Sequence, residues 1–155
     1  MKLYQREAKI YFQQELAIDT SISEVWQLLT TTAGLEKWFP ELKAEQLAEK
    51  KILTFEADGF KADMEVLAYE EPVHFKIMWD SGEVSFRLKE LLPQETRLEF
   101  LEVLPMDFPN LYQDIAGWHY VLKRLKAAAE GKEEIFTPEC IKQKAQELER
   151  MMREK

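Results

Sequence analysis

One long amphipathic segment near the C-terminus constrains the fold more than any other feature of this chain. Apolar side chains recur along it in alternating steps of four and three residues, which places them on one side of an α-helix. They are Leu111, Ile115, Trp118, Leu122, Leu125 and Ala129. Asn110 suits the N-terminal cap of this helix, and Gly131 suits its C-terminal stop. A stripe of this length must be covered by a large apolar surface elsewhere in the chain.

The middle of the chain can supply that surface. From Leu42 to Leu104, apolar and polar residues alternate with a period of two, as in strands that bury one face and expose the other. Turn sequences divide this region at Asp58-Gly59, Glu71-Pro72, Ser81-Gly82 and Pro93-Gln94. We therefore expect six consecutive antiparallel strands here.

Another strand and two short helical segments precede this region. The alternation over Ile10–Ile18 predicts a half-buried strand. Ser21 followed by Glu24 forms a capping box, which indicates a helix over Ile22–Thr31. A short amphipathic turn over Leu35–Phe39 follows that helix.

The chain ends in a second amphipathic helix. Thr137 and Pro138 mark its start, and its apolar residues are Ile141, Ala145, Leu148 and Met152. A chain of 155 residues is long enough for one domain with a substantial core. We expect residues 1–131 to form that domain, and residues 132–155 to be a helical extension that packs on it.

These elements predict an α+β helix-grip fold. A curved antiparallel sheet of about seven strands would wrap around the long C-terminal helix, because a sheet's apolar face and a helix's apolar stripe can bury each other. Two short helices would follow the first strand, and an extra terminal helix would complete the fold.

Two segments together resemble a known family. IDTSISEVWQLLTTTAGLEKWF, Ile18–Phe39, is similar to the opening of START-like (SRPBCC) domains, in the branch named for the activator of heat-shock protein 90 ATPase. IAGWHYVLKRLKAAAEG is similar to the closing helix of that branch. The resemblance extends from Ala8 to Gly131 and implies a cavity between sheet and helix, where relatives hold lipids, sterols, polyketides or other apolar molecules. The co-chaperones of this branch have a separate N-terminal domain that engages the chaperone. This sequence does not contain that domain, which argues against a heat-shock ATPase as the partner.

Composition narrows the function classes further. Twenty-nine acidic and twenty-one basic residues give a net charge of −8, which repels nucleic acid and anionic lipid surfaces. No apolar run approaches the thickness of a bilayer, and the first residues do not form a secretory signal. Cys140 is the single cysteine, so an internal disulfide and a multi-cysteine zinc site are excluded. We expect a cytoplasmic monomer or weak dimer without cofactor, metal, nucleic-acid partner or membrane insertion.

Large apolar side chains are numerous enough to line a cavity over the long helix. The candidate lining residues are Trp38, Phe39, Phe55, Met64, Phe75, Ile77, Trp79, Phe86, Trp118 and Leu122. The alternative is that these side chains fill the interior as an ordinary core.

Three polar residues could orient a ligand in such a cavity. Gln14 and Glu102 interrupt the apolar faces of their strands, and a buried polar group needs a partner that a ligand can supply. Burial would raise the pKa of Glu102. His119 lies on the flank of the helical stripe, where it could face the mouth of a cavity. The alternatives are a sheet bend that brings Gln14 or Glu102 to water, and a half-exposed His119 packed at the sheet edge.

No catalytic motif is readable. The sequence contains no Ser-His-Asp order, no glycine-rich phosphate loop and no HExxH spacing. The leading hypothesis is therefore non-enzymatic binding of a small hydrophobic or lipid-like ligand. One alternative is a co-chaperone-like module that acts on a heat-shock ATPase. Another is a cyclase or hydrolase with Glu102 or His119 as acid or base.

Overall fold

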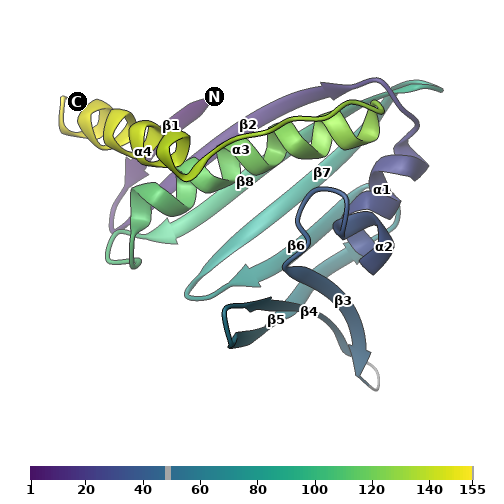
Figure 1. The fold of residues 1–155 in the computed structure, drawn as a ribbon, viewed down its shortest axis with the longest axis horizontal. Coiled ribbons are helices and arrows are strands. Elements are labelled where there is room, and N and C mark those ends of the chain that lie inside the picture. The colour runs from purple at the N-terminus through teal and green to yellow at the C-terminus, as the bar shows by residue number, and fades with distance from the viewer. Residues whose placement is uncertain (48–49, 155) are drawn as a thin grey trace.

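An antiparallel sheet of eight strands and one long helix dominate the computed structural model, which describes residues 1–47 and 50–154 (Figure 1). The strands are β1 (Lys2–Arg6), β2 (Lys9–Ile18), β3 (Leu42–Leu47), β4 (Lys50–Ala57), β5 (Phe60–Glu70), β6 (His74–Trp79), β7 (Gly82–Leu92) and β8 (Glu95–Pro105). The helices are α1 (Ile22–Thr30), α2 (Thr32–Leu35), α3 (Leu111–Ala129) and α4 (Pro138–Arg153).

The strand order explains how one curved sheet can embrace a helix. Across the sheet the order is β1-β2-β8-β7-β6-β5-β4-β3, so β3 to β8 form a meander and β2 closes against the last of them. Helix α3 lies across the concave face (Figure 1). The short helices α1 and α2, which connect β2 to β3, cover another part of the same face (Figure 1). The predicted α+β helix-grip fold, including the six strands of the middle region, is confirmed.

Strand β1 is an addition to the predicted sheet, which has eight strands where the sequence predicts about seven. It pairs with β2 through a turn in which Glu7 has a left-handed φ of 56°. That turn contains no glycine or asparagine, the residues that usually mark a tight hairpin. The sequence therefore gives no signal for this hairpin.

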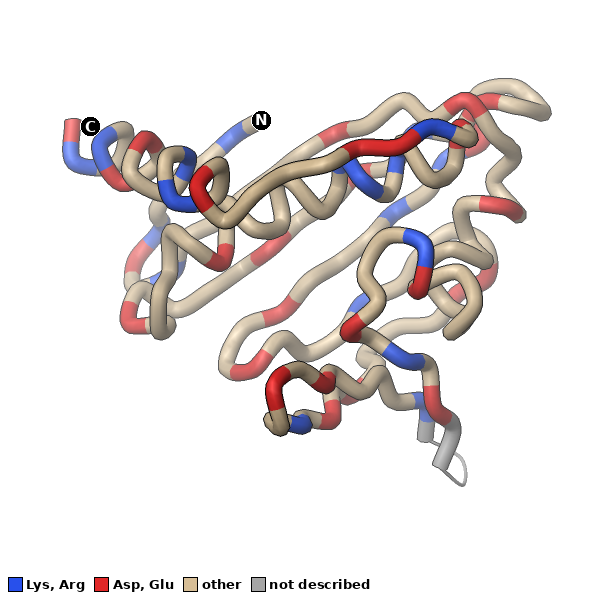
Figure 2. The backbone as a smooth tube through the Cα atoms, viewed as in Figure 1, with Lys and Arg blue, Asp and Glu red and all other residues tan. Residues whose placement is uncertain are grey.

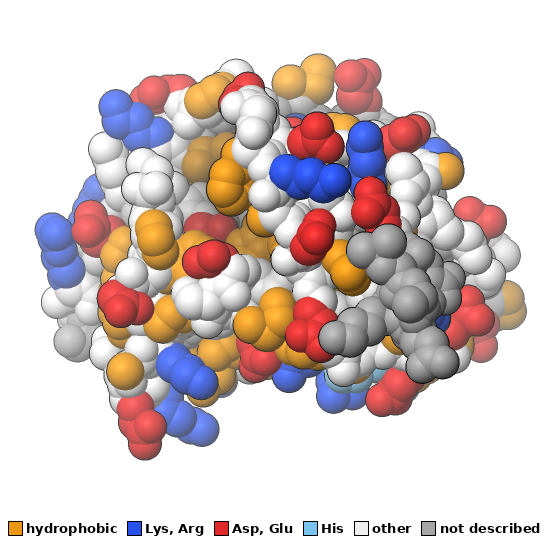
Figure 3. Space-filling view, turned by 90° about the horizontal axis from the view of Figure 1, so that it is seen from below, with side chains coloured by type: hydrophobic (Ala, Val, Ile, Leu, Met, Phe, Trp, Pro, Cys, Tyr) orange, Lys and Arg blue, Asp and Glu red, His pale blue; other side chains and the backbone are white. Residues whose placement is uncertain are grey.

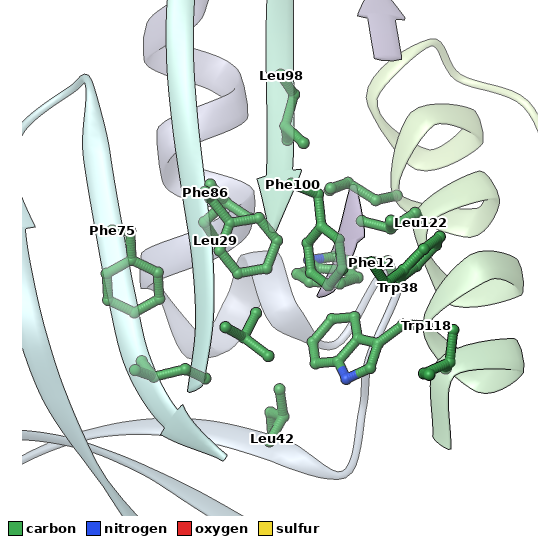
Figure 4. Close-up of a cluster of buried hydrophobic side chains, with 14 of the residues drawn as sticks. Phe12, Leu29, Trp38, Leu42, Phe75, Phe86, Leu98, Phe100, Trp118 and Leu122 are labelled. Carbon is green, nitrogen blue, oxygen red and sulfur yellow. The ribbon is translucent and has the colours of Figure 1, made fainter. Parts of the chain in front are cut away.

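Period-two alternation directs one face of each strand toward α3. In β8 the buried residues Leu98, Phe100 and Leu104 lie on this face. Figure 4 shows Trp118 and Leu122 of α3 on the other side of the same core. Sheet and helix thus bury each other, as the helical stripe requires.

The C-terminal end of α3 is attached to the end of β2. Lys126 Nζ donates a hydrogen bond to the carbonyl oxygen of Ala17 at 2.5 Å. The carboxylate of Glu130 accepts from Lys126 Nζ at 2.8 Å and from the backbone N–H of Asp19 at 3.0 Å. These bonds fix the register between the last turn of α3 and the sheet.

Helix α4 lies against α3. The segment after α3 runs back beside that helix before α4 begins (Figure 1). Thr137 caps α4 by accepting a hydrogen bond from the backbone N–H of Cys140 at 3.3 Å. Ala145 and Leu148 are buried in the same core as the sheet residues.

Candidate functional site

An apolar pocket of about 410 Å³ opens at one end of the sheet. It lies where the β4–β5 and β6–β7 hairpins approach the loop before α3. Its lining residues are Phe55, Phe60, Ala62, Asp63, Met64, Met78, Trp79, Asp80, Phe108 and Pro109. The view from this side shows hydrophobic side chains gathered around a hollow (Figure 3). The volume is in the range of small-molecule sites.

Aromatic rings connect the rim of the pocket to the interior. Phe60, at the rim, is 61% exposed, and its ring centroid is 6.4 Å from that of Phe55. Phe55 meets Trp79 edge to face at 6.3 Å, and Trp79 meets Trp118 of α3 at 5.0 Å. The pocket therefore ends on a rigid aromatic wall that reaches α3.

Trp79 also connects the pocket to a pair of carboxyl groups, of which one is fully buried and the other half-buried. Its indole N–H donates a hydrogen bond to Asp114 Oδ1 at 2.8 Å. Asp114 lies in the first turn of α3, where the helix dipole favours a negative charge. Glu102 of β8 is fully buried and interacts with Asp114.

The environment of Glu102 favours its protonated form. Burial, the negative charge of Asp114 and a hydrogen bond with Asp114 together raise its pKa well above the usual range. If both groups are ionised, neither Glu102 oxygen nor Asp114 Oδ2 has a hydrogen-bond donor within the described residues. When Glu102 is protonated, its O–H can donate a hydrogen bond to the Asp114 carboxylate, which gives one of these oxygens a donor. Neither acid forms an ion pair with a described lysine or arginine.

Trp118 also has a polar group in this region that lacks a partner among the described residues. The indole N–H of Trp118 is buried without an acceptor among residues 1–47 and 50–154. Trp118 lies one helical turn after Asp114, so both side chains are on the sheet-facing side of α3. The aromatic interior next to the pocket therefore contains buried polar groups that lack hydrogen-bond partners among the described residues.

Most residues predicted to line a central cavity pack against one another. The buried members of that set are Trp38, Met64, Phe75, Ile77, Phe86, Trp118 and Leu122. Trp118, for example, has ring contacts with Phe86 at 6.1 Å and with Phe100 at 5.0 Å. Of the predicted lining residues, Phe55, Met64 and Trp79 line the apolar pocket, and Phe39 packs behind them, with its ring 6.0 Å from that of Trp79.

The three predicted polar residues lie in different surroundings. Glu102 is fully buried, interacts with Asp114 of α3 and does not line the pocket. Gln14 of β2 lies opposite Phe100 of β8. Its Oε1 is buried with no hydrogen-bond partner among the described residues, and its Nε2 donates to the Glu15 carbonyl at 3.3 Å. The structure does not bring Gln14 to the apolar pocket.

His119 lies on the side of α3 that carries α4. Its pKa is lowered to about 4, mainly by burial and also by the positive charges of Lys144 on α4 and Lys123 on α3. Its ring packs edge to face on Tyr120 with centroids 5.0 Å apart. It does not line the pocket, so the predicted place at a cavity mouth differs from its position in the structure.

Sequence reasoning did not identify Asp114, Phe60 or Phe108. Asp114 precedes Trp118 by four residues, a spacing that indicates a shared helix face. Phe60 directly follows the Asp58-Gly59 turn, where a large apolar residue is unusual. Phe108 lies in a loop without periodicity, and no sequence signal marks it.

Residues 1–47 and 50–154 contain no group of three His, Cys, Asp or Glu side chains arranged to hold a metal ion. Within the same ranges, no helix is both long and apolar enough to cross a membrane.

Comparisons with known proteins agree with this architecture. The chain is similar to a conserved protein of unknown function from Enterococcus faecalis, with 33% identity, 96% of this chain and 90% of that chain covered, and a TM-score of 0.85. The Aha1 dimer from Colwellia psychrerythraea has 21% identity and a TM-score of 0.64, over 77% of this chain and 96% of that one. CalU16 from Micromonospora echinospora has 22% identity and a TM-score of 0.63, over 90% and 84%. A comparison with curated proteins found no match.

A family model gives the assignment. The model described as "Activator of Hsp90 ATPase homolog 1-like protein" matches residues 19–130. The match spans α1 to the end of α3 and thus includes the pocket, Glu102 and Asp114. The chain therefore belongs to the family of activator of Hsp90 ATPase homolog 1-like proteins, on the START-like fold.

Proposed function

We propose that this protein binds a small, mostly apolar ligand in the pocket beside Trp79 and does not transform it chemically. The observation that carries this proposal is the pocket of about 410 Å³, whose walls are apolar apart from two aspartates. Burying an exposed phenylalanine contributes about 2 kcal/mol, so a ligand that covers Phe60 gains a substantial part of its binding free energy there.

The composition of the lining supports binding over catalysis. Among the described residues that form it, none is a serine, cysteine, histidine or lysine, so the side chains that most often act as nucleophiles are missing. Neither Glu102 nor His119 belongs to the lining. This argues against the cyclase or hydrolase alternative, which needs one of them in contact with substrate.

The test uses 1-octanol as a neutral apolar probe in an NMR titration of the full chain. We expect chemical-shift changes at Phe55, Met64 and Phe108 and at the indole N–H of Trp79. Phe60→Ala should weaken octanol binding about tenfold, which corresponds to about 1.4 kcal/mol. Leu92→Ala is the matched control, because Leu92 is 59% exposed and lies outside the pocket.

The outcomes separate clearly. Shifts confined to the pocket, with a selective loss in Phe60→Ala, support the proposal. No saturable shifts, or shifts scattered over the surface and equally affected by Leu92→Ala, would overturn it.

A further inference from the structure

We propose that the ligand of this pocket is an organic cation: an apolar body that carries an ammonium group, held over the ring of Trp79 between Asp63 and Asp80. This inference rests on the proposed function, because it assigns a chemical class to the ligand of the same pocket. It draws on the charges in the lining, the aromatic walls and the carboxylate bonded to Trp79.

The charge of the lining has one sign. Asp63 and Asp80 are its charged residues, and no lysine or arginine accompanies them. Asp63 Oδ1 accepts a hydrogen bond from the Thr54 hydroxyl at 3.3 Å, but neither aspartate forms an ion pair within residues 1–47 and 50–154. Acidic residues also gather along the β4–β5 and β6–β7 hairpins that border the pocket (Figure 2). A cationic ligand would supply the missing counter-charge.

The aromatic walls suit the same kind of ligand. The pocket is lined by aromatic side chains from the β4–β5 hairpin, from β6 and from the loop before α3. They are Phe55, Phe60, Trp79 and Phe108. The faces of aromatic rings attract cations, tryptophan most strongly, and aromatic cages with nearby carboxylates recognise ammonium groups. A neutral apolar ligand would contact the aromatic walls but leave the two carboxylates without a counter-charge.

Trp79 is hydrogen-bonded to an anion, which strengthens this preference. Its N–H donates to the Asp114 carboxylate at 2.8 Å, and a donor bonded to an anion shifts electron density onto the indole ring. The Asp114 carboxylate bonded to the indole N–H therefore favours positive charge beside this ring.

An anion is disfavoured by the same features. A carboxylate or phosphate in this pocket would face Asp63 and Asp80 without any basic partner in the lining. Repulsion of like charges in a partly desolvated site lowers affinity strongly.

The experiment compares probes that share one alkyl chain: octylamine, octyltrimethylammonium, 1-octanol and octanoate. Binding to the full chain is followed by NMR at pH 7, with Trp79 and Phe55 as reporters. We expect both cations to bind at least tenfold more tightly than octanol, and octanoate to bind most weakly. The quaternary cation has no N–H, so its binding isolates the attraction of charge to rings and carboxylates.

Variants assign the preference to the pocket. Asp63→Asn combined with Asp80→Asn should bring the affinities for octylamine and octanol to within about threefold, while octanol binding stays unchanged and reports an intact pocket. Glu133→Gln combined with Glu134→Gln is the control, because it removes the same two charges from the segment between α3 and α4. This control should retain the preference for cations.

Each result has a distinct meaning. Equal affinities for octylamine and octanol at the same reporters would overturn the cation assignment and leave the proposed function standing. Equal loss of preference in both double variants would also overturn it, since the effect would then follow from net charge. No response of the pocket reporters to any probe would overturn the proposed function itself.

Discussion

The hydrogen bond between Trp79 and Asp114 should contribute measurably to stability. It joins the pocket wall on β6 to the first turn of α3 at 2.8 Å. Trp79→Phe removes the donor and leaves the carboxylate with one fewer partner, which costs about 1.5–3 kcal/mol for a bond to a charged group. The smaller ring costs about 1 kcal/mol more in apolar burial. The total loss in unfolding free energy should therefore be about 2.5–4 kcal/mol.

Trp118→Phe provides a matched control in the same aromatic cluster. Its indole N–H has no acceptor among the described residues, so the substitution loses ring area but no hydrogen bond. We expect a cost of about 1 kcal/mol. The difference between the two variants measures the hydrogen bond rather than the change of ring.

A double-mutant cycle isolates the interaction. Urea unfolding, followed by far-ultraviolet circular dichroism, gives the unfolding free energies of Trp79→Phe, Asp114→Ala and the double variant. The coupling energy should be about 1.5 kcal/mol or more. A coupling below about 0.5 kcal/mol, or equal costs for Trp79→Phe and Trp118→Phe, would refute the reasoning.

Three further predictions concern stability and its dependence on pH. Gly34→Ala should lower the unfolding free energy by about 3 kcal/mol, because the new Cβ would lie 2.2 Å from the backbone oxygen of Gln27. Gly117→Ala, with open space at its Cβ, should raise it by about 0.5–1 kcal/mol; similar melting temperatures for the two variants would contradict this. Burial lowers the pKa of His119 from 6.5 to about 4, so the unfolded state binds the proton first and stability falls as pH falls between these values. His119→Gln should remove about 1–2 kcal/mol of that fall, allowing for solvent screening, and parallel urea midpoints at pH 7 and pH 4 would disprove it. Burial raises the pKa of Glu102 above 4.5, so the native state keeps its proton while the unfolded state loses it, and stability falls as pH rises above 4.5. Glu102→Gln should therefore gain stability relative to the parent as pH rises, and a constant difference between their urea midpoints would rule this out.

The fold was predictable where periodicity is strong. The stripe from Leu111 to Leu125 and the alternation of Leu98, Phe100 and Leu104 each indicate one buried face, and burying them together leaves few arrangements. Strand β1 escaped prediction because it is five residues long and turns at Glu7 without a turn-forming residue.

The site was predictable only in part. Side-chain size identifies Phe55 and Trp79 as large apolar groups that could line a cavity. It does not predict that Phe86 and Trp118 fill the interior, nor that the pocket lies near Phe60. Packing decides that distribution, and packing depends on distances between elements that periodicity does not encode. The pairing of Glu102 with Asp114 depends in the same way on how α3 crosses β8.

Three hydrogen bonds that involve Lys126 and Glu130 hold the last turn of α3 at the end of β2, whereas one, from Trp79 to Asp114, holds its first turn. That first turn follows the loop that contains Phe108 and carries Asp114, beside the pocket. A tilt of α3 about its last turn would change the width of the pocket more than it changes the packing of the aromatic core near Leu122. The width of the proposed binding pocket would then depend on the loop between β8 and α3, and hydrogen exchange should be faster in the first turn of α3 than in its last.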